Sequence, residues 1–332
     1  MMLRLATVGS GKIVGWFLKG LKNVSGIRHT AVYSRSFERG LEFAGEHGLG
    51  EDAVWTDLEK MADSGTVDAV YIATPNRLHV EQAEVFLRRG IHVLCEKPAV
   101  VTCEQLERLL AVAEENGAIF MEAIMAPHQP RFVQLKQAVE EIGTLSGAVL
   151  NFSQLSSRYP ALLRGELPNI FNKELCAGAL MDIGVYDVYL ALALFGMPKR
   201  VEASAHFLPG GADGAGNAMF VYPWGSCLMS WSKIGQSRAP SEIVGDRGTV
   251  TFSPVSRILN IRLWKNDGES GLLFGEEPHS ASLGNEAADF VRYILDREGT
   301  ADEYAGMVQL SRDGTWLMET IREKCGIRFD GE

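Results

Sequence analysis

Two side chains one helical turn apart, Asp182 and Tyr186, could act together on one substrate. They lie in the stretch "GALMDIGVYDVYLALALF", residues 178–195, which is otherwise mostly apolar. Residues four apart lie on the same face of a helix. A carboxylate can hold a substrate hydroxyl, and a phenol can exchange a proton with one. The spacing therefore predicts a helix that presents an acid–base pair.

An ordinary buried helix is the alternative interpretation of this stretch. Leu180, Ile183 and Leu190 are expected to pack in a core. However, burying an aspartate without a partner is costly, so Asp182 needs either a partner or a wet cleft. We favour a functional face on this helix.

A glycine turn near the N-terminus could bind a phosphate group. Gly9 and Gly11 follow a predicted strand at 3–9 and precede a helical pattern. Glycines here let the backbone approach a pyrophosphate, which sits at the positive end of the helix. A tight turn without a ligand is the alternative, but the strand–turn–helix context favours nucleotide binding. Val14 stands where the glycine fingerprint of dinucleotide-binding folds has its third small residue. The expected contacts are Gly9, Ser10, Gly11, Lys12 and Ile13.

The end of the second predicted strand, 27–34, indicates which nicotinamide cofactor is bound. An acidic residue there would bind the ribose 2′-hydroxyl, whereas an arginine accommodates a 2′-phosphate. Residues 27–37 contain no carboxylate, and Ser34, Arg35 and Arg39 are available instead. Two solvated arginines at a helix start are the alternative. We expect NADP as the cofactor, with NAD as the second choice.

Two further loops follow predicted strands at the edge where open α/β sheets bind ligands. "ATPNRLH" follows the strand at 67–75, and "CEKPAV" follows the strand at 91–98. A lysine in a loop is usually just solvated, so Lys97 alone is a weak signal. The expected contacts from these loops are Thr74, Pro75, Asn76, His79, Glu96 and Lys97.

The elements that position these residues form two regions. Up to 123, strands alternate with helices, which predicts a parallel sheet covered on both faces. From 201 to 275, strands separated by Gly and Pro turns predict an antiparallel sheet. The fold class is therefore α/β: a Rossmann dinucleotide-binding domain at 1–122, and an α+β substrate and oligomerisation domain at 123–332 built on a mostly antiparallel, open-faced sheet.

The bulk properties of the 332 residues exclude several classes of protein. The net charge of −10 argues against a nucleic-acid partner. No run reaches the ~18 apolar residues of a membrane span, and no signal peptide is recognisable, so we expect a cytoplasmic protein. No C-x-x-C pair is present, so we expect neither a zinc site nor a disulfide framework. The five cysteines are Cys95, Cys103, Cys176, Cys227 and Cys325.

Together, these motifs resemble the glucose–fructose oxidoreductase/inositol dehydrogenase (Gfo/Idh/MocA) family. The resemblance rests on "GSGKIV", "ATPNRLHVEQA", "EKP", "MEAIMAPHQP" and "GALMDIGVYD", and "SEIVGDRGTVTF" matches the usual strand pair of its second domain. A tyrosine after D-x-G-x resembles the branch with dihydrodiol dehydrogenases and NADP-linked xylose dehydrogenases. Pro127 and Gln129 stand where relatives often carry Arg and His, which leaves the substrate class open.

This resemblance implies a dehydrogenase or reductase acting on a hydroxyl of a sugar, polyol or related diol. It implies that Lys97 contacts the substrate and the nicotinamide ribose, that Asp182 orients substrate hydroxyls, and that Tyr186 is the acid/base. Lys97 would also stabilise the phenolate of Tyr186. A homodimer or homotetramer, formed through the exposed face of the second sheet, is implied as well. The alternatives are an NAD-dependent glycoside-cleaving enzyme of the same fold and a non-catalytic cofactor-binding sensor.

Overall fold

The computed structural model describes residues 2–268 and 270–329, which form two compact units. Unit 1 contains Met1–Ala123 and His279–Ser311, and unit 2 contains Ile124–Pro278 and Arg312–Glu332. The first boundary lies next to the one expected at 122/123. The second domain was expected to run without interruption over 123–332, whereas residues 279–311 belong to unit 1.

Unit 1 is an α/β unit. Its strands are β1 (Leu3–Val8), β2 (Ile27–Tyr33), β3 (Val54–Trp55), β4 (Ala69–Ile72), β5 (His92–Glu96) and β6 (Phe120–Ala123). Its helices are α1 (Lys12–Leu21), α2 (Phe37–Glu46), α3 (Leu58–Asp63), α4 (His79–Leu87), α5 (Cys103–Glu115), α9 (His279–Leu295) and the first part of α10 (Ala301–Cys325). Single 3₁₀ turns lie at Glu51–Ala53 and Asn76–Leu78.

The six strands of unit 1 are all parallel and lie in the order β3-β2-β1-β4-β5-β6. This is the doubly wound dinucleotide-binding order, so the predicted fold class is confirmed. Both faces of the sheet are covered. Tyr71 of β4 stacks on Phe17 of α1 at 3.8 Å between ring centroids, while its neighbours Val70 and Ile72 belong to the apolar cluster that includes Phe86 of α4.

Helix α5 shows why local sequence signals succeed in this unit. The hydroxyl of Thr102 accepts a hydrogen bond from the backbone N–H of Gln105 at 3.2 Å, and the side chain of Gln105 reaches back to the N–H of Val101 at 2.9 Å. Gly117, with φ +61°, follows the end of the helix. The pattern Thr-x-x-Gln thus forms a capping box at the start of the helix, and a glycine with positive φ follows its end, so short-range sequence signals set both ends.

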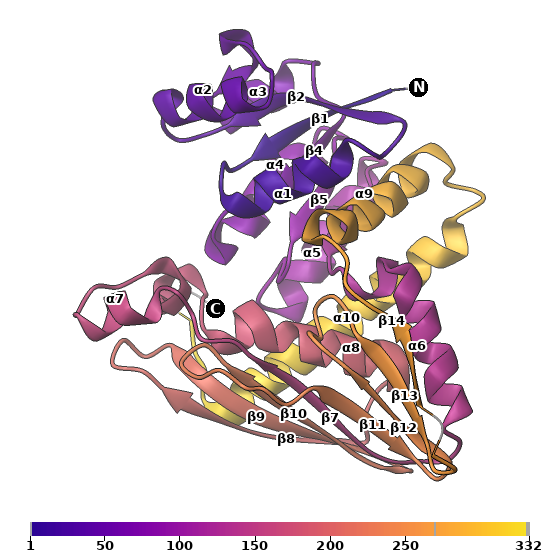
Figure 1. Cartoon of the computed structure of the whole chain (residues 1–332). Coiled ribbons are helices and arrows are strands. Elements are labelled where there is room, and N and C mark those ends of the chain that lie inside the picture. The colour runs from indigo at the N-terminus through magenta and orange to yellow at the C-terminus, as the bar shows by residue number, and fades with distance from the viewer. Residues whose placement is uncertain (1, 269, 330–332) are drawn as a thin grey trace. The chain divides into compact units, whose positions relative to one another are not determined.

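Helices α1 and α9 cross at an unusually close approach. A Cβ at Gly20 of α1 would lie 2.3 Å from the carbonyl oxygen of Ser280 and 2.7 Å from the backbone nitrogen of Gly284. These neighbours are backbone atoms, so they cannot rotate away. The two glycines therefore set the packing of α9 on α1 (Figure 1).

A methyl group at this crossing should destabilise the protein. We expect Gly20→Ala to lower the free energy of unfolding by about 1–3 kcal/mol, the usual cost of overpacking. Gly15→Ala on the same helix is the control, because its Cβ would meet nothing within 4 Å. That control should be neutral or stabilising by about 0.5–1 kcal/mol. Urea unfolding measures both, and equal stability of the two variants would contradict the backbone contact.

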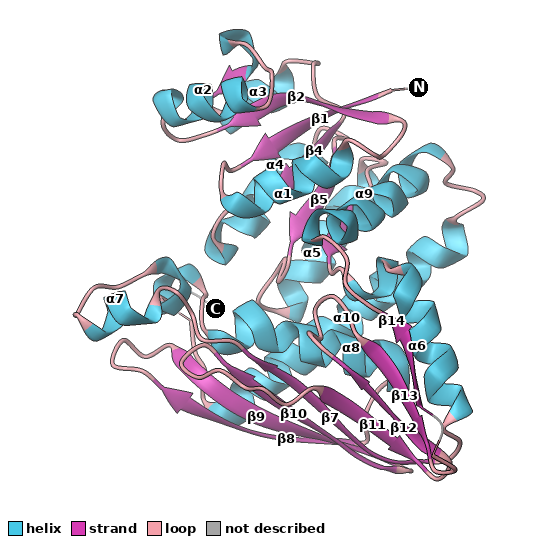
Figure 2. Cartoon of the chain, in the orientation of Figure 1, coloured by secondary structure: helices cyan, strands magenta, loops and turns pink. Residues whose placement is uncertain are grey.

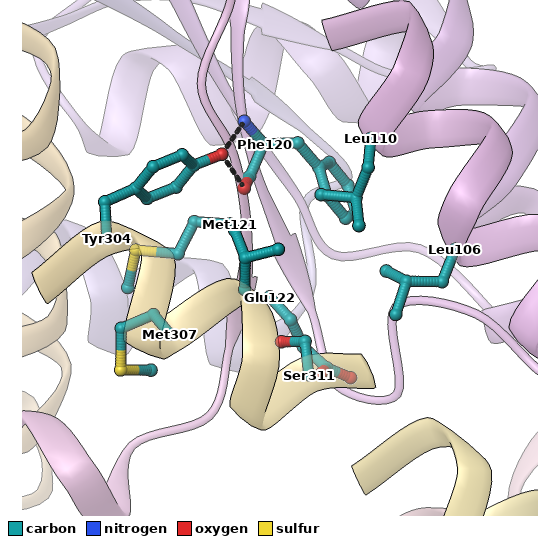
Figure 3. Close-up of a pocket in the computed structure, with 9 residues that line it drawn as sticks. Leu106, Leu110, Phe120, Met121, Glu122, Tyr304, Met307 and Ser311 are labelled. Atoms are coloured by element: carbon teal, nitrogen blue, oxygen red, sulfur yellow. Dashed lines mark hydrogen bonds between the residues drawn. The ribbon is translucent and has the colours of Figure 1, made fainter. Parts of the chain in front are cut away.

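The start of α10 completes unit 1 against β6. The hydroxyl of Tyr304 donates a hydrogen bond to the carbonyl oxygen of Phe120 at 2.9 Å and accepts one from its N–H at 3.3 Å (Figure 3). Beside this contact lies a small, mainly apolar pocket, whose lining includes Leu106, Leu110 and Met307 (Figure 3). Edge strand β6 is therefore bonded to a segment about 180 residues further along the chain.

Unit 2 is an α+β unit. Its strands are β7 (Leu145–Ser153), β8 (Arg200–Phe207), β9 (Asp213–Tyr222), β10 (Gly225–Ser232), β11 (Ser241–Gly245), β12 (Gly248–Phe252), β13 (Ile261–Lys265) and β14 (Ser270–Phe274). Its helices are α6 (Pro130–Glu141), α7 (Tyr159–Leu163), a π-helix (Leu180–Gly184), α8 (Val185–Phe195) and the rest of α10. Single 3₁₀ turns lie at Ala126–His128, Asn169–Phe171 and Lys173–Leu175.

The eight strands of unit 2 lie in the order β14-β13-β12-β11-β7-β10-β9-β8. Every neighbouring pair is antiparallel except β7 and β10, which are parallel. Helices α6, α8 and α10 lie along one face of this sheet (Figure 2). The predicted second domain, a mostly antiparallel sheet with helices on one side, is confirmed.

The two faces of this sheet differ in chemistry. On β10, Cys227, Met229 and Trp231 are buried on the helix-covered face, whereas Leu228 points the other way and is 46% exposed. Val149, its partner on β7, is 41% exposed. The sheet thus has an open outer face with apolar side chains, as the alternating sequence pattern predicts.

Candidate active site

The glycine turn lies between β1 and α1, at the carboxyl end of the central strand. Gly9 has φ +115°, and a Cβ there would lie 2.8 Å from the carbonyl oxygen of Ala73. Gly11 is the N-cap of α1, makes no side-chain capping bond, and has open space where a Cβ would be. No acidic residue lies in the first turn of α1, and Lys12 is exposed. The N–H groups of this helix start therefore fit a phosphate of a dinucleotide.

The departure from the glycine fingerprint has a simple consequence. Val14 is fully buried and packs toward the sheet, whereas Gly15 has open space around it. Helix α1 therefore packs on the sheet through a side chain, where a smaller residue would allow a closer approach. Ile13 is half-buried and Ser10 is exposed at the same turn.

The residues expected to select the cofactor lie after β2. Ser34 is buried and its N–H donates to the carbonyl of Trp55 at 3.0 Å, which fixes the start of the loop. Arg35 and Arg39 are exposed, and within the described residues neither guanidinium has an ion-pair partner. The first carboxylate after β2, Glu38 in the first turn of α2, accepts a hydrogen bond from the hydroxyl of Ser36 at 2.7 Å. Two cations are thus available for an anionic group.

His79 links the two loops that follow β4 and β5. It is fully buried, with one ring nitrogen 2.8 Å from the carbonyl oxygen of Thr74 and the other 3.0 Å from that of Pro98. Burial lowers the pKa of His79, so the ring is neutral and donates to one carbonyl at a time. His79 was expected to contact the cofactor. Its partners make it a positioning residue, which holds half-buried Thr74, Pro75 and Asn76 beside the loop of Lys97.

Two hydrogen bonds hold the Glu-Lys-Pro loop in place. The carboxylate of Glu96 accepts a hydrogen bond of 2.5 Å from the hydroxyl of Tyr71, which is buried and stacked on Phe17. Lys97 is half-buried at the end of β5. The loop also holds Ala99, whose N–H donates to the carboxylate of Glu122 at 2.9 Å. Lys97 is therefore presented by a rigid loop at the carboxyl edge of the sheet.

Sequence reasoning missed a second acid near this loop. Glu286 of α9 is fully buried, and neither of its carboxylate oxygens has a hydrogen-bond partner among the described residues. Burial raises the pKa of Glu286 well above its usual value, nearby Glu96 raises it further, and Lys97 lowers it. Burial therefore favours the protonated, neutral form of Glu286. The only feature of the sequence that could have pointed to Glu286 is that a carboxylate occurs on an apolar face of a helix.

The second part of the predicted site lies in unit 2, on the helix that carries Asp182 and Tyr186. Between Gly178 and Leu192, these two residues are the only ones that are not buried. The ring of Tyr186 lies 5.6 Å from the ring of Phe152 on β7. The structure thus brings Asp182 and Tyr186 to one open face of an otherwise buried helix.

The helix begins with a wide turn. Leu180–Gly184 is a π-helix, which continues as α8 without a break. A regular α-helix was expected over the whole stretch, and the π segment is the difference. Gly184 makes it fit, because a Cβ there would lie 3.0 Å from the Trp231 ring. Short π segments occur often at functional sites, and here the segment contains Asp182.

A buried carboxylate holds the start of this helix. Asp213 accepts hydrogen bonds from the N–H of Leu180 at 2.7 Å and from the indole of Trp231 at 3.2 Å. Burial raises the pKa of Asp213 to about 6, although these hydrogen bonds lower it. A Cβ at Gly178 would lie 2.1 Å from Asp213, so only glycine fits there. Asp213 replaces the missing N-cap side chain of the π-helix.

The open carboxylate of this helix has a cationic partner that the sequence did not reveal. The ammonium of Lys233 lies 2.6 Å from Oδ2 of Asp182. The side chain of Lys233 is 11% exposed and that of Asp182 is 29% exposed. Lys233 is 51 residues away in "SWSKIGQS", so no local spacing signals the pair.

The two carboxylates of the motif have opposite environments. Asp187, the residue after Tyr186, is fully buried on the face toward the sheet. Burial raises its pKa well above the usual value, and a backbone hydrogen bond from Phe152 lowers it. Burial therefore favours the protonated form of Asp187, whereas Asp182 is ion-paired and partly exposed.

The chemistry of the described residues also bears on metal binding and membrane insertion. Within residues 2–268 and 270–329, no three His, Cys, Asp or Glu side chains gather in a way that could hold a metal ion. One segment, Lys173–Phe195, is long and apolar enough to cross a membrane by length and composition. However, 72% of its apolar window is buried inside the protein, as in a core helix.

Comparison with known families gives matches to both units. The family model described as "Oxidoreductase family, NAD-binding Rossmann fold" (GFO_IDH_MocA) matches residues 3–124, and the GFO/IDH/MocA C-terminal domain matches 132–251. Together they cover most of the chain and include every residue of the predicted site.

Individual relatives agree with these family matches. The chain is 37% identical to scyllo-inositol 2-dehydrogenase (NADP(+)) of Bacillus subtilis, over 100% of this chain and 99% of the relative. It is 26% identical to trans-1,2-dihydrobenzene-1,2-diol dehydrogenase of Danio rerio, over 78% of each. A 3-ketoreductase of Actinomadura kijaniata, solved with NADP and TDP-benzene, has the same fold, with a TM-score of 0.85, 98% of each chain covered and 23% identity.

Proposed function

Because this chain belongs to the Gfo/Idh/MocA family of oxidoreductases, we propose that it is an NADP-dependent dehydrogenase or reductase. It acts on a CH–OH group, or the corresponding carbonyl, of a sugar, polyol or related diol. One observation carries the proposal: between Gly178 and Leu192, Asp182 and Tyr186 are the only residues of this apolar helix that are not buried. A core helix has no need of an ion-paired carboxylate and a phenol on one exposed face.

The residues of unit 1 support the choice of cofactor. The uncapped start of α1 and the open space at Gly11 fit a pyrophosphate, and the exposed Arg35 and Arg39 fit a 2′-phosphate. NADP also stands in the name of the Bacillus subtilis relative. When bound, the nicotinamide exchanges a hydride with the substrate carbon.

The protein's own groups supply the proton chemistry and the geometry. We propose that Tyr186 removes the hydroxyl proton during oxidation and returns it during reduction. Lys97 stabilises the phenolate form of Tyr186 and contacts the substrate, and Asp182 holds a neighbouring hydroxyl in place. All five cysteines are free, as is usual in reducing compartments, so we also propose a cytoplasmic location.

An NADP-coupled absorbance screen tests the proposal. The panel contains aldoses, polyols, inositols including scyllo-inositol, and vicinal diols, each assayed by the absorbance of the reduced nicotinamide with NADP and with NAD. Tyr186→Phe is the control that separates enzyme turnover from contaminating dehydrogenases. Absence of nicotinamide reduction with every substrate class would contradict the proposal.

We further propose that a second copy of the chain covers the outer face of the unit 2 sheet. Across this face, Val149, Leu228 and Met219 are neighbours on β7, β10 and β9. An exposed apolar patch on a sheet marks an interaction surface.

A charge on this face should therefore dissociate the homodimer or homotetramer. We expect Leu228→Glu to give the monomer mass in multi-angle light scattering, while the wild type gives at least the dimer mass. Met197→Glu is the matched control, because Met197 is similarly exposed, at 42%, but lies outside the strands of this sheet. A monomeric wild type would refute the interface.

A further inference from the structure

Lys233 is held in place more firmly than a surface lysine. It directly follows β10, and its N–H donates to the carbonyl oxygen of Gly214 at 2.8 Å. Its own carbonyl accepts from the N–H of Ser156 at 2.9 Å. The backbone of Lys233 is therefore hydrogen-bonded to β9 on one side and to the loop after β7 on the other. These bonds fix the position from which its side chain reaches Asp182, at 2.6 Å.

This ion pair contributes little to stability by itself. Removing two charges from water costs about as much as their attraction returns, so half-buried pairs are weak evidence for a structural role. The pair lies on the same open helix face as Tyr186, the proposed acid/base. A charged pair next to a proposed acid/base can bind the substrate, which a pair buried in the core cannot do.

The ammonium of Lys233 has more donors than its bond to Asp182 uses. An ammonium has three donors, and one of them bonds Oδ2 of Asp182. Lys233 can therefore donate a further hydrogen bond to the oxygen of a hydroxyl that lies next to the one held by Asp182.

We propose that Lys233 is a substrate-specificity residue, which together with Asp182 recognises two adjacent hydroxyls of the substrate. Asp182 accepts from the first hydroxyl and also orients it, and Lys233 donates to the second. The proposed substrates are thereby narrowed from sugars, polyols and related diols to polyols that carry two adjacent hydroxyls. This inference rests on the proposed function and identifies the substrate class of that same site.

Kinetics with paired substrates test the assignment. The probes are scyllo-inositol and a mono-deoxy-inositol, which lacks one hydroxyl, assayed with saturating NADP. We expect wild-type kcat/KM to favour the full polyol by roughly 10- to 100-fold, as for a lost hydrogen bond to a charged group. In Lys233→Met this ratio should fall toward one, mainly through a higher KM for the full polyol. The KM for NADP should change less than about twofold.

Three further variants make the outcome specific. Lys233→Arg keeps the charge and should retain part of the preference, which a purely steric role would not explain. Lys233→Gln keeps a polar head group and replaces Lys233→Met if that variant does not fold. Lys199→Met is the matched control, since Lys199 is exposed in the same unit, and should behave as wild type.

The possible failures are distinguishable. If the wild type oxidises the polyol but Lys233→Met keeps the wild-type ratio, the specificity role of Lys233 is wrong and the proposed function stands. If the wild type oxidises none of the screened polyols, sugars or diols, the proposed function fails and the assignment of Lys233 fails with it.

Discussion

In Tyr186→Phe, we expect kcat for alcohol oxidation to fall by about 10²–10⁴-fold, the usual loss when a general acid–base group is removed. The substitution deletes the phenol oxygen and keeps the ring, which lies 5.6 Å from that of Phe152. Packing should therefore persist. Steady-state absorbance assays measure kcat, and fluorescence titration of NADP shows whether cofactor affinity stays within about tenfold of wild type.

Lys97→Met should cost a similar factor if Lys97 and Tyr186 act as one unit. The double variant should then lose little more than either single one, because residues that act together are not additive. The pH profile provides a second measurement. The wild-type oxidation rate should rise with pH through one ionisation, and Tyr186→Phe should lose that dependence.

Tyr159→Phe is the matched control for the phenol. Tyr159 lies in the same unit, at the start of the short helix α7. Its ring contacts the ring of Phe171. This variant should keep wild-type kcat. Near-normal turnover in Tyr186→Phe would transfer the acid–base role to another group and remove the main support for the catalytic assignment.

Arg35→Asp should reverse or abolish the preference for NADP over NAD. Loss of a charge-assisted hydrogen bond to the 2′-phosphate costs about 1.5–3 kcal/mol, which corresponds to roughly 10- to 100-fold in the ratio of the two kcat/KM values. The new carboxylate can also bind the ribose 2′-hydroxyl of NAD. The ratio is measured with one polyol and each cofactor in turn.

The control for this charge reversal is Arg28→Asp. Arg28 is an exposed arginine at the start of β2, the opposite end of the strand from the loop of Arg35. It should leave the cofactor ratio unchanged. An unaltered ratio in Arg35→Asp would show that the 2′-phosphate is bound elsewhere, and Arg39 is the next residue to replace.

Much of the fold was predictable, because it depends on short-range signals. The strand–turn–helix at Gly9, the capping box at Thr102 and the alternation along β10 each involve residues close in sequence. Strand β3 was missed because it has only two residues, Val54 and Trp55. The π-helix was missed because the residue that packs against it at Gly184, Trp231, is far away in sequence.

The parts of the site that escaped prediction all depend on long-range contacts. Lys233 reaches Asp182 across 51 residues, and Asp213 supports Leu180 across 33. His79 was selected from its motif, but only the two carbonyls on either side of its ring show that it joins two loops. Sequence motifs thus suggested candidate site residues near the surface, and the structure was needed to find the residues that hold them in place.

The composition of unit 1 from two distant chain segments has a consequence for how the protein is made. The parallel sheet of Met1–Ala123 leaves the ribosome early, but α9 and the start of α10 follow some 150 residues later. Until then, the Gly20 face of α1 and the edge of β6 have no cover. Unpaired edges and uncovered apolar faces favour aggregation. We therefore expect the nascent dinucleotide-binding unit to stay incomplete, and open to chaperones, until the chain has been synthesised beyond Ser311.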